Sequence, residues 1–595
     1  MATITAAAPQ PTGEVLPVAE RELEKYIQDP QNIYEVSDDL KTDSDSNSQI
    51  KQDGVKRVEV ITTVWSKQVL VLMFVLLYLV SFSDQLLQSV QGGLTPYVTS
   101  AFSEHGLLST VSIVASILGG VANLTIAKII DIWGRCEGFV VMLLFMVIGM
   151  IMKATCQNVE TYAAAHTFYW VGHIGLGYVI NVMLADMTTL KNRMILFSIN
   201  STPLLATNFA GPKIADLFYT HVNFRWAFGA FCFILIGFCT PVVVIFFLSQ
   251  RKVNRMGIAP ERVKSRSIGE SLRYYFVQFD VVGIFLTTAG WSLLLLPFSL
   301  ANTAPNGWKT GYVIAMIVLG VACLAAFVVW ERCFASVAYF PFRLLKDRTI
   351  LGASLLYGIM FISIYCWDAY YSSYLQVVHN LSITNSGYVL NSFSLMSSFI
   401  GPFVGFLIRY TGRYKWISYS GIPFCVLGTA LLIHFRQPHS HVGYLVMCQL
   451  FNGVSSGIWA LTAQLAVMAS VSHQEVAVAL AMWGMFGSIG ASIGLAIAGG
   501  LWTNILPTQL YNRLPESSKD LAPSIYASIV TQLSYPRGSP IRDAIIAAYG
   551  DVQRKMVIAG ASFIPLLLIC IVVWKNIDVK KLEQTHGKQV KGNVW

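Results

Sequence analysis

Ionisable side chains inside long apolar runs are the first candidates for chemistry in this sequence. Asp84 lies 17 residues after Lys67, which at about 1.5 Å per residue places it about 25 Å along a helix. His173 lies in another apolar run, and an imidazole titrates near neutral pH. Charged groups at membrane depth are costly and usually functional, so both side chains are candidates for exchanging a proton. Two alternatives stay open: Asp84 pairs with Lys213 at similar depth, and His173 is a core residue whose hydrogen bonds are satisfied.

A cluster of aromatic residues and one carboxylate lies near the end of a further apolar run. Trp367, Tyr371 and Tyr374 fall on one helical face, and Asp368 lies beside them. Aromatic rings offer broad, flat contacts to a bulky ligand, and an Asp accepts a proton or a donor group. An aromatic belt at the membrane interface explains the same residues equally well. Weaker candidates for lining a central cavity are Asn391, Asn452 and Trp459.

The polar segments lack the patterns of an enzyme. They contain no Ser-His-Asp arrangement, no metal-spaced cluster and no phosphate-binding loop. All ten cysteines lie in or beside apolar segments, which indicates packing rather than disulfides or metal ligands. We therefore predict a protein that is not an enzyme, has no metal site and needs no cofactor.

The elements that must hold these side chains are membrane-spanning helices. A composition of 54% hydrophobic and 12% charged residues, with a mean hydropathy of +0.57, excludes an ordinary soluble globular protein. Roughly 20 apolar residues cross a bilayer core as a helix. We therefore predict an all-α polytopic membrane protein with fourteen spans: 66–90, 106–126, 137–156, 162–184, 194–216, 226–248, 278–300, 311–331, 350–374, 386–408, 416–435, 442–468, 476–500 and 555–574.

The distribution of Lys and Arg predicts the orientation of these spans. Basic residues gather in alternate connections, including the loop 249–277, whereas the connections 91–105 and 375–385 contain none. We therefore expect both termini in the cytosol and read the net charge of +9 as a topological signal rather than as a nucleic-acid surface. The tail 1–65 has no apolar signal-peptide segment and is predicted to be disordered, and 575–595 is predicted to be a cytosolic tail.

The polar stretch 501–553 is predicted to lie outside. Apolar and polar residues alternate at helical spacing in Ile525–Leu533 and Ile541–Val552, which indicates short helices over the outer mouth, with a floppy loop as the alternative. A glycosylation sequon at Asn380 also faces outside in this topology.

A short motif occurs twice along the chain. The segment 127–135 reads Ala-Lys-Ile-Ile-Asp-Ile-Trp-Gly-Arg, and 405–415 reads Gly-Phe-Leu-Ile-Arg-Tyr-Thr-Gly-Arg-Tyr-Lys, at an offset of 278 residues. Glycine permits a tight turn between antiparallel helices, and Arg and Asp pair at helix ends. The repeat predicts six spans, two linking spans and six more. The residues expected at this cytosolic gate are Asp131, Gly134, Arg135, Asp186, Arg193, Arg409, Gly412 and Arg413.

This motif resembles the signature turn of the major facilitator superfamily, with departures. Ala127 stands where the signature has Gly, Ile132 and Cys136 where it has basic residues, and Arg409 where it has Asp. The resemblance implies the major facilitator fold: two six-helix bundles plus two linking transmembrane helices. The expected parts are an N-terminal bundle over 66–248, linking helices over 278–331 and a C-terminal bundle over 350–574.

Longer segments resemble the fungal siderophore-iron transporters of this superfamily. They are 54–67, 185–193, 501–507, 532–540 and 548–554. The resemblance implies proton-coupled import of intact ferric siderophore chelates by alternating access, with iron entering as part of the substrate. The expected partners are the chelate, protons and the lipid bilayer, and the expected state is a monomer in the plasma membrane, with an endosomal or vesicular membrane as the alternative. Residues expected to capture chelate in the outer loop are Tyr511, Tyr526, Tyr535 and Tyr549.

Two other functions stay open at this point. Glutathione/proton exchangers belong to the same broad family and share much of this pattern. A non-transporting nutrient sensor built on a transporter fold is less favoured, because the tails are modest in length and the gate motifs persist.

Overall fold

We describe the protein from a computed structural model. The described residues are 61, 65–188, 196, 199–256, 267–301, 304–337, 340–471 and 475–578, without the side chains of Asp131, Ile268 and Ala477. Within these residues every regular element is helical, which confirms the all-α prediction.

The helices fall into three groups along the chain. The N-terminal half contains α4 (Lys67–Ala101), α5 (Leu108–Ile132), α6 (Arg135–Thr155), α7 (Val159–Asp186), α9 (Pro203–His221) and α10 (Phe224–Arg255). The middle group contains α11 (Ile268–Gln278), α12 (Val281–Leu295), α13 (Pro297–Leu300) and α14 (Gly311–Val329). The C-terminal half contains α15 (Arg348–Asp368), α16 (Tyr371–His379), α17 (Ile383–Thr411), α18 (Tyr414–Phe435), α19 (Val442–Met468), α20 (Val476–Arg513), α21 (Ala522–Ala527), α22 (Ile529–Ser534), α23 (Pro540–Ala561) and α24 (Ile564–Val573).

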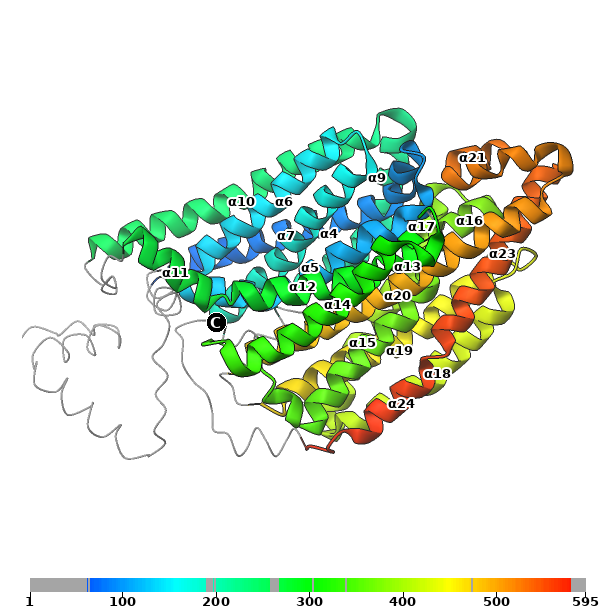
Figure 1. Ribbon diagram of the computed structural model, residues 1–595. Helices are drawn as coiled ribbons and strands as arrows, with labels where there is room; N and C mark the ends of the chain where they lie inside the picture. Colours follow the sequence, from blue (N-terminus) through cyan, green and yellow to red (C-terminus); the bar gives the residue numbers. More distant parts are fainter. Residues whose placement is uncertain are drawn as a thin grey trace, which may run out of the picture. The chain divides into compact units, whose positions relative to one another are not determined.

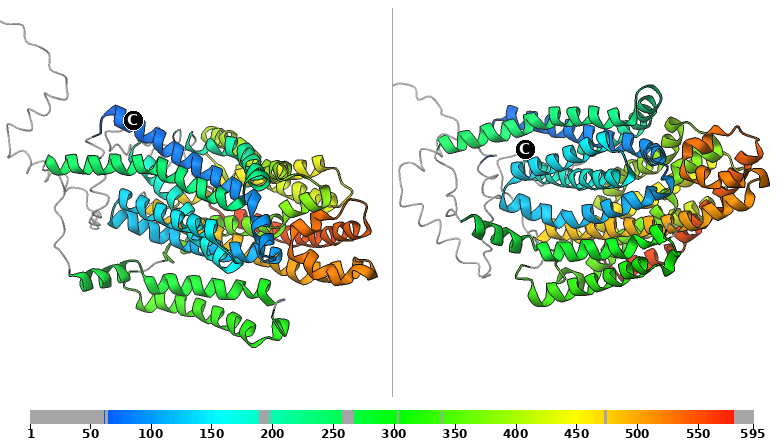
Figure 2. Two further views of the ribbon diagram at one scale, coloured as in Figure 1. Left: turned by 90° about the horizontal axis from the view of Figure 1, so that it is seen from above. Right: turned by 45° about the horizontal axis from the view of Figure 1, so that its top comes forward.

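Each half forms its own bundle (Figure 1). In the N-terminal half, α7 packs on α5 and α6, while α4 packs on α9 and α10. In the C-terminal half, α19 packs on α17 and α18, while α15 packs on α20, α23 and α24. Helices α12 and α14 pack on each other and contact the rest of the protein through α5 and α20, and Figure 2 shows this green pair at the side of the other helices.

Contacts between the two halves follow the sequence repeat. Helix α5 packs on α20, and α9 packs on α17. The offset of 278 residues carries α5 onto α17 and α9 onto α20, so the two contacts are counterparts. The central interface is therefore built twice from corresponding helices, as expected for a transporter made of two repeats.

The spans are long, apolar and covered with exposed hydrophobic side chains. Thirteen helices in the described part of the chain are long and apolar enough to cross a membrane. The other predicted span, 194–216, coincides in part with α9, which carries Asn208, Lys213 and Asp216. Large apolar side chains such as Phe233 and Phe406 are each 73% exposed, which suits contact with lipid rather than water.

Several helices extend beyond the predicted boundaries. Helix α4 continues to Ala101 instead of ending near 90, so most of the predicted connection 91–105 is helical, and α20 continues to Arg513 instead of 500. The predicted last span, 555–574, begins inside α23 and continues as α24 after a break at 562–563. Hydropathy marks the apolar stretch, but these helices continue because their polar residues, such as Gln91 and Thr99, are buried against protein.

Candidate functional site

We use "outer" and "inner" for the ends that the distribution of Lys and Arg predicts to face the outside and the cytosol. The predicted candidates Asp84 and His173 are partners in the structure. Asp84 on α4 is 5% exposed, and its Oδ1 lies 2.7 Å from Nδ1 of His173 on α7. Lys213, the residue predicted as the alternative partner of Asp84, makes no ion pair within the described residues. A carboxylate and an imidazole at this distance share a proton or form an ion pair, so the two candidates form one polar unit between α4 and α7.

The predicted aromatic face of the ninth span packs around a buried arginine. Trp367, Tyr371 and Tyr374 are all at most 1% exposed. Arg436, which follows α18, lies with its Cζ 3.8 Å from the Tyr371 ring centroid, and its Nη1 donates to the Trp367 carbonyl. Asp368 is half-buried at the end of α15. In this conformation the aromatic residues therefore surround a guanidinium, and their predicted contact with substrate stays a prediction.

Three of the predicted cavity residues line one small pocket inside the C-terminal half. Trp367, Asn452 and Trp459 contribute to it, with side chains from α15, α18, α19 and α24. Asn452 Oδ1 accepts a hydrogen bond from Thr429 at 3.1 Å, and Trp459 Nε1 donates to the Ser418 carbonyl at 2.9 Å. The pocket therefore combines aromatic walls with polar groups that are held in place by neighbouring helices.

Hydrogen bonds join the outer ends of the two halves. Tyr370 Oη donates to the Gly106 carbonyl at 2.8 Å, and Thr384 donates to Asp216 at 2.6 Å. Asn391, another predicted cavity residue, donates to the Asn208 carbonyl at 2.8 Å. A further bond joins Tyr97 of α4 to Gln376 of α16. Gly106 lies between α4 and α5, and Tyr370 lies directly before α16. Because α4, Gly106 and α9 belong to one half, and Tyr370, α16 and α17 to the other, these bonds hold the outer end closed.

The outer segment between α20 and α24 is folded rather than a floppy loop. Two short helices, α21 and α22, lie where the spacing predicts a helix at Ile525–Leu533, and α23 covers the second predicted helix. The backbone amide of Ile529 donates to Ser100 of α4 at 3.0 Å, and Arg542 donates to the Val377 carbonyl at 2.8 Å. The segment therefore contacts both halves.

The four outer tyrosines differ in exposure. Tyr511 is exposed, with the Lys519 ammonium 5.2 Å from its ring centroid. Tyr526 and Tyr535 are half-buried, and Tyr549 is fully buried with its hydroxyl donating to Gln532 at 2.5 Å. Only Tyr511 is openly accessible in this conformation, and capture of substrate by these residues stays a prediction.

At the outer end, Asn380 closes the C-terminus of α16. It adopts a left-handed backbone conformation with φ 56° and its side chain is exposed. Its glycosylation stays a prediction.

At the inner end, the first copy of the repeated motif forms an ion pair and the second does not. Arg135 Nε lies 2.8 Å from Asp186 Oδ2, and Arg135 Nη1 donates to the Ile130 carbonyl at 3.0 Å. Gly134 and Gly412 have φ values of 129° and 69°, as the tight turns require. Arg409 and Arg413 are exposed and make no ion pair within the described residues. The Asp131 side chain and Arg193 lie outside the described residues.

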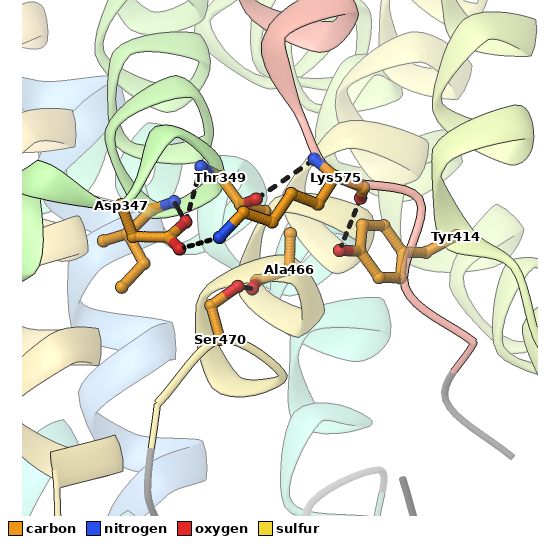
Figure 3. A network of polar contacts seen from close by, with 7 residues as sticks. Asp347, Thr349, Tyr414, Ala466, Ser470 and Lys575 are labelled. Atoms are coloured by element: carbon orange, nitrogen blue, oxygen red, sulfur yellow. Dashed lines mark hydrogen bonds and ion pairs between the residues drawn. The ribbon is translucent and has the colours of Figure 1, made fainter. Parts of the chain in front are cut away.

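A polar network fastens the end of the last helix to the inner end of the C-terminal half (Figure 3). Lys575 Nζ lies 2.5 Å from Asp347 Oδ2, and the backbone amide of Lys575 donates to Thr349 Oγ1 at 3.1 Å. Tyr414 Oη donates to the Lys575 carbonyl at 3.2 Å. The chain just after α24 is thereby bound to the beginnings of α15 and α18.

Several buried polar residues were not predicted from the sequence. Arg436 follows a predicted span by one residue, and Lys153 and His166 lie inside predicted spans. The criterion that selects Asp84, an ionisable group within an apolar run, applies equally to Lys153 and His166. Applied to every position, that criterion finds both of them.

Comparison with known proteins defines the family. The family model of the Major Facilitator Superfamily matches residues 77–378 and 353–509. The "MFS siderochrome iron transporter 1" of Ajellomyces capsulatus is 55% identical over 563 residues, covering 95% of this chain and 97% of the relative. The "Siderophore iron transporter mirB" of Emericella nidulans is 42% identical over 550 residues, covering 92% and 91%.

Solved structures support the fold alone. The peptide transporter POT in complex with sulfate superimposes with a TM-score of 0.53 at 14% sequence identity, covering 85% of this chain and 96% of that chain. These likenesses confirm the predicted major facilitator fold. The chain belongs to the fungal MFS siderochrome iron transporter family of the major facilitator superfamily.

Proposed function

We propose that this protein imports intact ferric siderophores across the membrane, driven by protons that bind at Asp84 and His173. The observation that carries the proposal is the 55% identity, over nearly the full length of both chains, to a protein named a siderochrome iron transporter. Iron arrives within the chelate, so the protein recognises an organic ligand shell rather than a bare metal ion.

The charge of the Asp84–His173 pair explains how a proton drives the cycle. Without the extra proton, the pair consists of a carboxylate and a neutral imidazole and carries one negative charge. With it, the pair is neutral overall, either as an ion pair or as two neutral groups. Because an uncompensated charge inside the membrane is costly, the protonated form is better suited to conformational change.

The outer contacts support alternating access. Bonds such as Tyr370 to the Gly106 carbonyl and Asn391 to the Asn208 carbonyl close the outer end in this conformation. An outward-open state requires that these bonds separate and that their polar groups become hydrated. Chelate then reaches the cavity from outside. When the outer bonds re-form, the outer end closes again and the chelate is released on the inner side.

Uptake of radioactive iron tests the proposal. The protein is expressed in a fungus that lacks its own chelate uptake, and iron is supplied as individual ferric siderophores with and without a protonophore. We expect accumulation from at least one chelate that the protonophore abolishes. Absence of uptake from any chelate, together with proton-driven release of glutathione, would instead identify the exchanger.

Variants of the pair test the proton site. Asp84→Asn and His173→Gln keep the size of each side chain, and we expect both to lose protonophore-sensitive accumulation. Ser83→Ala is the matched control, because Ser83 is a buried polar neighbour on α4, and among the described residues its hydroxyl bonds only to the Leu79 carbonyl of its own helix, at 2.9 Å. Retained proton-driven uptake in both pair variants would refute the assignment.

A further inference from the structure

A second cluster of ionisable groups is buried in the N-terminal half. Lys153 of α6 is 0% exposed, and its Nζ lies 2.5 Å from Gln91 Oε1 of α4 and 3.0 Å from His166 Nδ1 of α7. Gln91 Nε2 also lies 3.2 Å from His166 Nδ1. No carboxylate lies within ion-pair distance of Lys153 among the described residues. The three side chains, called the Lys153 cluster below, therefore bring an amine and an imidazole together without an acidic partner.

The register of α4 and α7 places this cluster directly outward of the Asp84–His173 pair. Gln91 follows Asp84 by seven residues on α4, and His166 precedes His173 by seven residues on α7. The two helices run in opposite directions, so both steps lead toward the outer end, by about 10 Å at 1.5 Å per residue. The Lys153 cluster and the pair thus form two successive polar levels between the same two helices.

Aromatic rings fill the space between the two levels. The Tyr169 ring stacks with His166 and His173, with centroid distances of 6.2 and 5.8 Å. Trp170 contacts the same two imidazoles at 5.8 and 5.3 Å. The Lys153 ammonium lies 4.0 Å from the Tyr169 ring centroid, an arrangement in which the ring face stabilises a cation. Tyr169 therefore touches every imidazole and amine of both levels.

The surroundings suit one positive charge and disfavour two. The Lys153 ammonium also lies 5.7 Å from the Tyr162 ring centroid and 5.5 Å from that of Phe228. Two protons on Lys153 and His166 would place two cations 3.0 Å apart with no counter-charge, so the cluster holds one. The titratable groups around the cluster are Cys156 beside Lys153, His173 beside His166, and the hydroxyls of Tyr162 and Tyr169. Beyond them, Asp84 of α4 faces Tyr169, and Arg225 of α10 donates to the Cys156 carbonyl.

We propose that Lys153 and His166 form a second proton-binding site, which acts with Asp84 and His173 during proton-coupled uptake. This inference rests on the proposed function. The proton resides on Lys153 Nζ or on His166 Nδ1, and Gln91 Oε1 orients the amine toward the imidazole. A proton bound at the Lys153 cluster changes the proton affinity of the Asp84–His173 pair. The effect acts through the aromatic rings that both levels contact and through repulsion between the cluster's charge and a protonated His173. A proton from outside thus meets the Lys153 cluster before it meets the deeper pair.

Purified protein in liposomes separates this role from a structural one. Two rates are compared: accumulation of ferric siderophore driven by an imposed pH gradient, and exchange of labelled for unlabelled chelate at equal pH. For Lys153→Met we expect gradient-driven accumulation to fall at least about tenfold while exchange stays within about twofold of wild type. Methionine has a similar size, and Gln91 Nε2 lies 3.2 Å from His166 Nδ1 without the lysine's help, so we expect the fold to be preserved.

Two further variants sharpen the test. His166→Gln is expected to weaken the dependence of accumulation on outside pH while exchange continues. Lys309→Met is the control for removal of a lysine elsewhere, because Lys309 is exposed at the end of the short helix Gly307–Lys309 before α14, outside the cluster and the repeated motif. We expect it to retain gradient-driven accumulation.

Each outcome decides the proposal. Unchanged accumulation and an unchanged pH profile in Lys153→Met and His166→Gln would overturn it and leave the proposed function intact. Loss of exchange together with accumulation in both variants would show a structural role and also overturn it. A wild-type protein that moves chelate in neither assay would refute the proposed function itself, and the second site would fall with it.

Discussion

Replacing Tyr370 by phenylalanine is expected to favour separation of the outer ends of the two halves. Tyr370 Oη donates to the Gly106 carbonyl at 2.8 Å and lies 3.0 Å from Ser109 Oγ, across the interface between the halves. Its ring stacks on Trp502 with centroids 4.0 Å apart. Phenylalanine keeps the ring and its stacking but leaves the buried carbonyl without this donor. Once the ends separate, water is able to bond to the same carbonyl, so the change destabilises the closed state selectively.

The magnitude of this effect follows from the lost hydrogen bond. A neutral hydrogen bond contributes about 0.5–1.5 kcal/mol net, and a buried acceptor left without a donor costs about 1–3 kcal/mol. We take a range of about 1–2 kcal/mol, which changes the ratio of closed to open protein by roughly 5- to 30-fold. The serine hydroxyl is able to turn toward the carbonyl, which favours the lower part of the range.

The ratio of closed to open protein is measured by the accessibility of a single cysteine. Ile383 is 5% exposed, and its Cγ2 lies 3.5 Å from the position that a Cβ on Gly93 would occupy in the opposite half. The reporter is Ile383→Cys in protein whose ten native cysteines are replaced, labelled from outside with a membrane-impermeant maleimide. Where opening is rare and rapidly reversed, the labelling rate is proportional to the fraction of open protein. Tyr370→Phe is therefore expected to raise the labelling rate by roughly 5- to 30-fold.

The control removes a comparable bond at the other end of the protein. Tyr414 is fully buried and donates to the Lys575 carbonyl at 3.2 Å within the C-terminal half, so Tyr414→Phe should leave outer labelling unchanged. Equal labelling rates in wild type and Tyr370→Phe would refute the reasoning. A rise of the same size in Tyr414→Phe would also refute it, because the effect would then be general loosening.

Three further changes test the packing and the inner end. Gly490→Ala is expected to lower stability by about 1–3 kcal/mol in thermal unfolding in detergent, because its Cβ would collide with the backbone of α15, whereas Gly405→Ala has open space and should be neutral. Burial raises the pKa of Asp347, but hydrogen bonds from Lys575 and from two backbone amides of α15 outweigh it and leave that pKa below its ordinary value. Asp347→Asn should therefore cost under about 1 kcal/mol near neutral pH, and the difference from wild type should vanish as the pH falls through the lowered pKa, because the wild-type carboxyl is then neutral too. Arg135→Lys keeps the charge but is expected to lose the bond to a backbone carbonyl, lowering the melting temperature by the equivalent of about 1 kcal/mol.

The sequence predicted the helical architecture well because lipid imposes a simple rule. A chain that crosses a bilayer must satisfy its backbone within helices, and apolar runs reveal where it does so. The ends of α4 and α20 were missed because they are held by protein contacts rather than by lipid. Thr99, for example, is fully buried on the predicted connection 91–105, and Trp502 is fully buried beyond the predicted end of its span.

The partnership of Asp84 and His173 illustrates what hydropathy does not supply. Each residue is conspicuous alone as an ionisable group in an apolar run. Their distance of 2.7 Å depends on how α4 packs on α7, which no single apolar run encodes. Arg436 is harder still, because it lies at the edge of a run, where an arginine ordinarily reaches water, and only the tertiary packing buries it at 0% exposure.

The two halves repeat the same packing but differ in their buried ionisable residues. An offset of 278 residues carries the interface helices onto their counterparts, but it carries Asp84 onto Ile362 and His173 onto Phe451. It carries Lys153 onto Leu431 in the same way. The packing is thus repeated while these buried ionisable groups are confined to the N-terminal half. The corresponding region of the C-terminal half instead has the aromatic pocket, so the proposed proton sites and the aromatic residues predicted to contact the chelate lie in different halves. Coupling between them must then pass through the contacts between the two halves, which include α5 on α20 and α9 on α17. Removing a single hydrogen bond between the halves, such as that from Tyr370 to the Gly106 carbonyl, therefore tests this coupling directly.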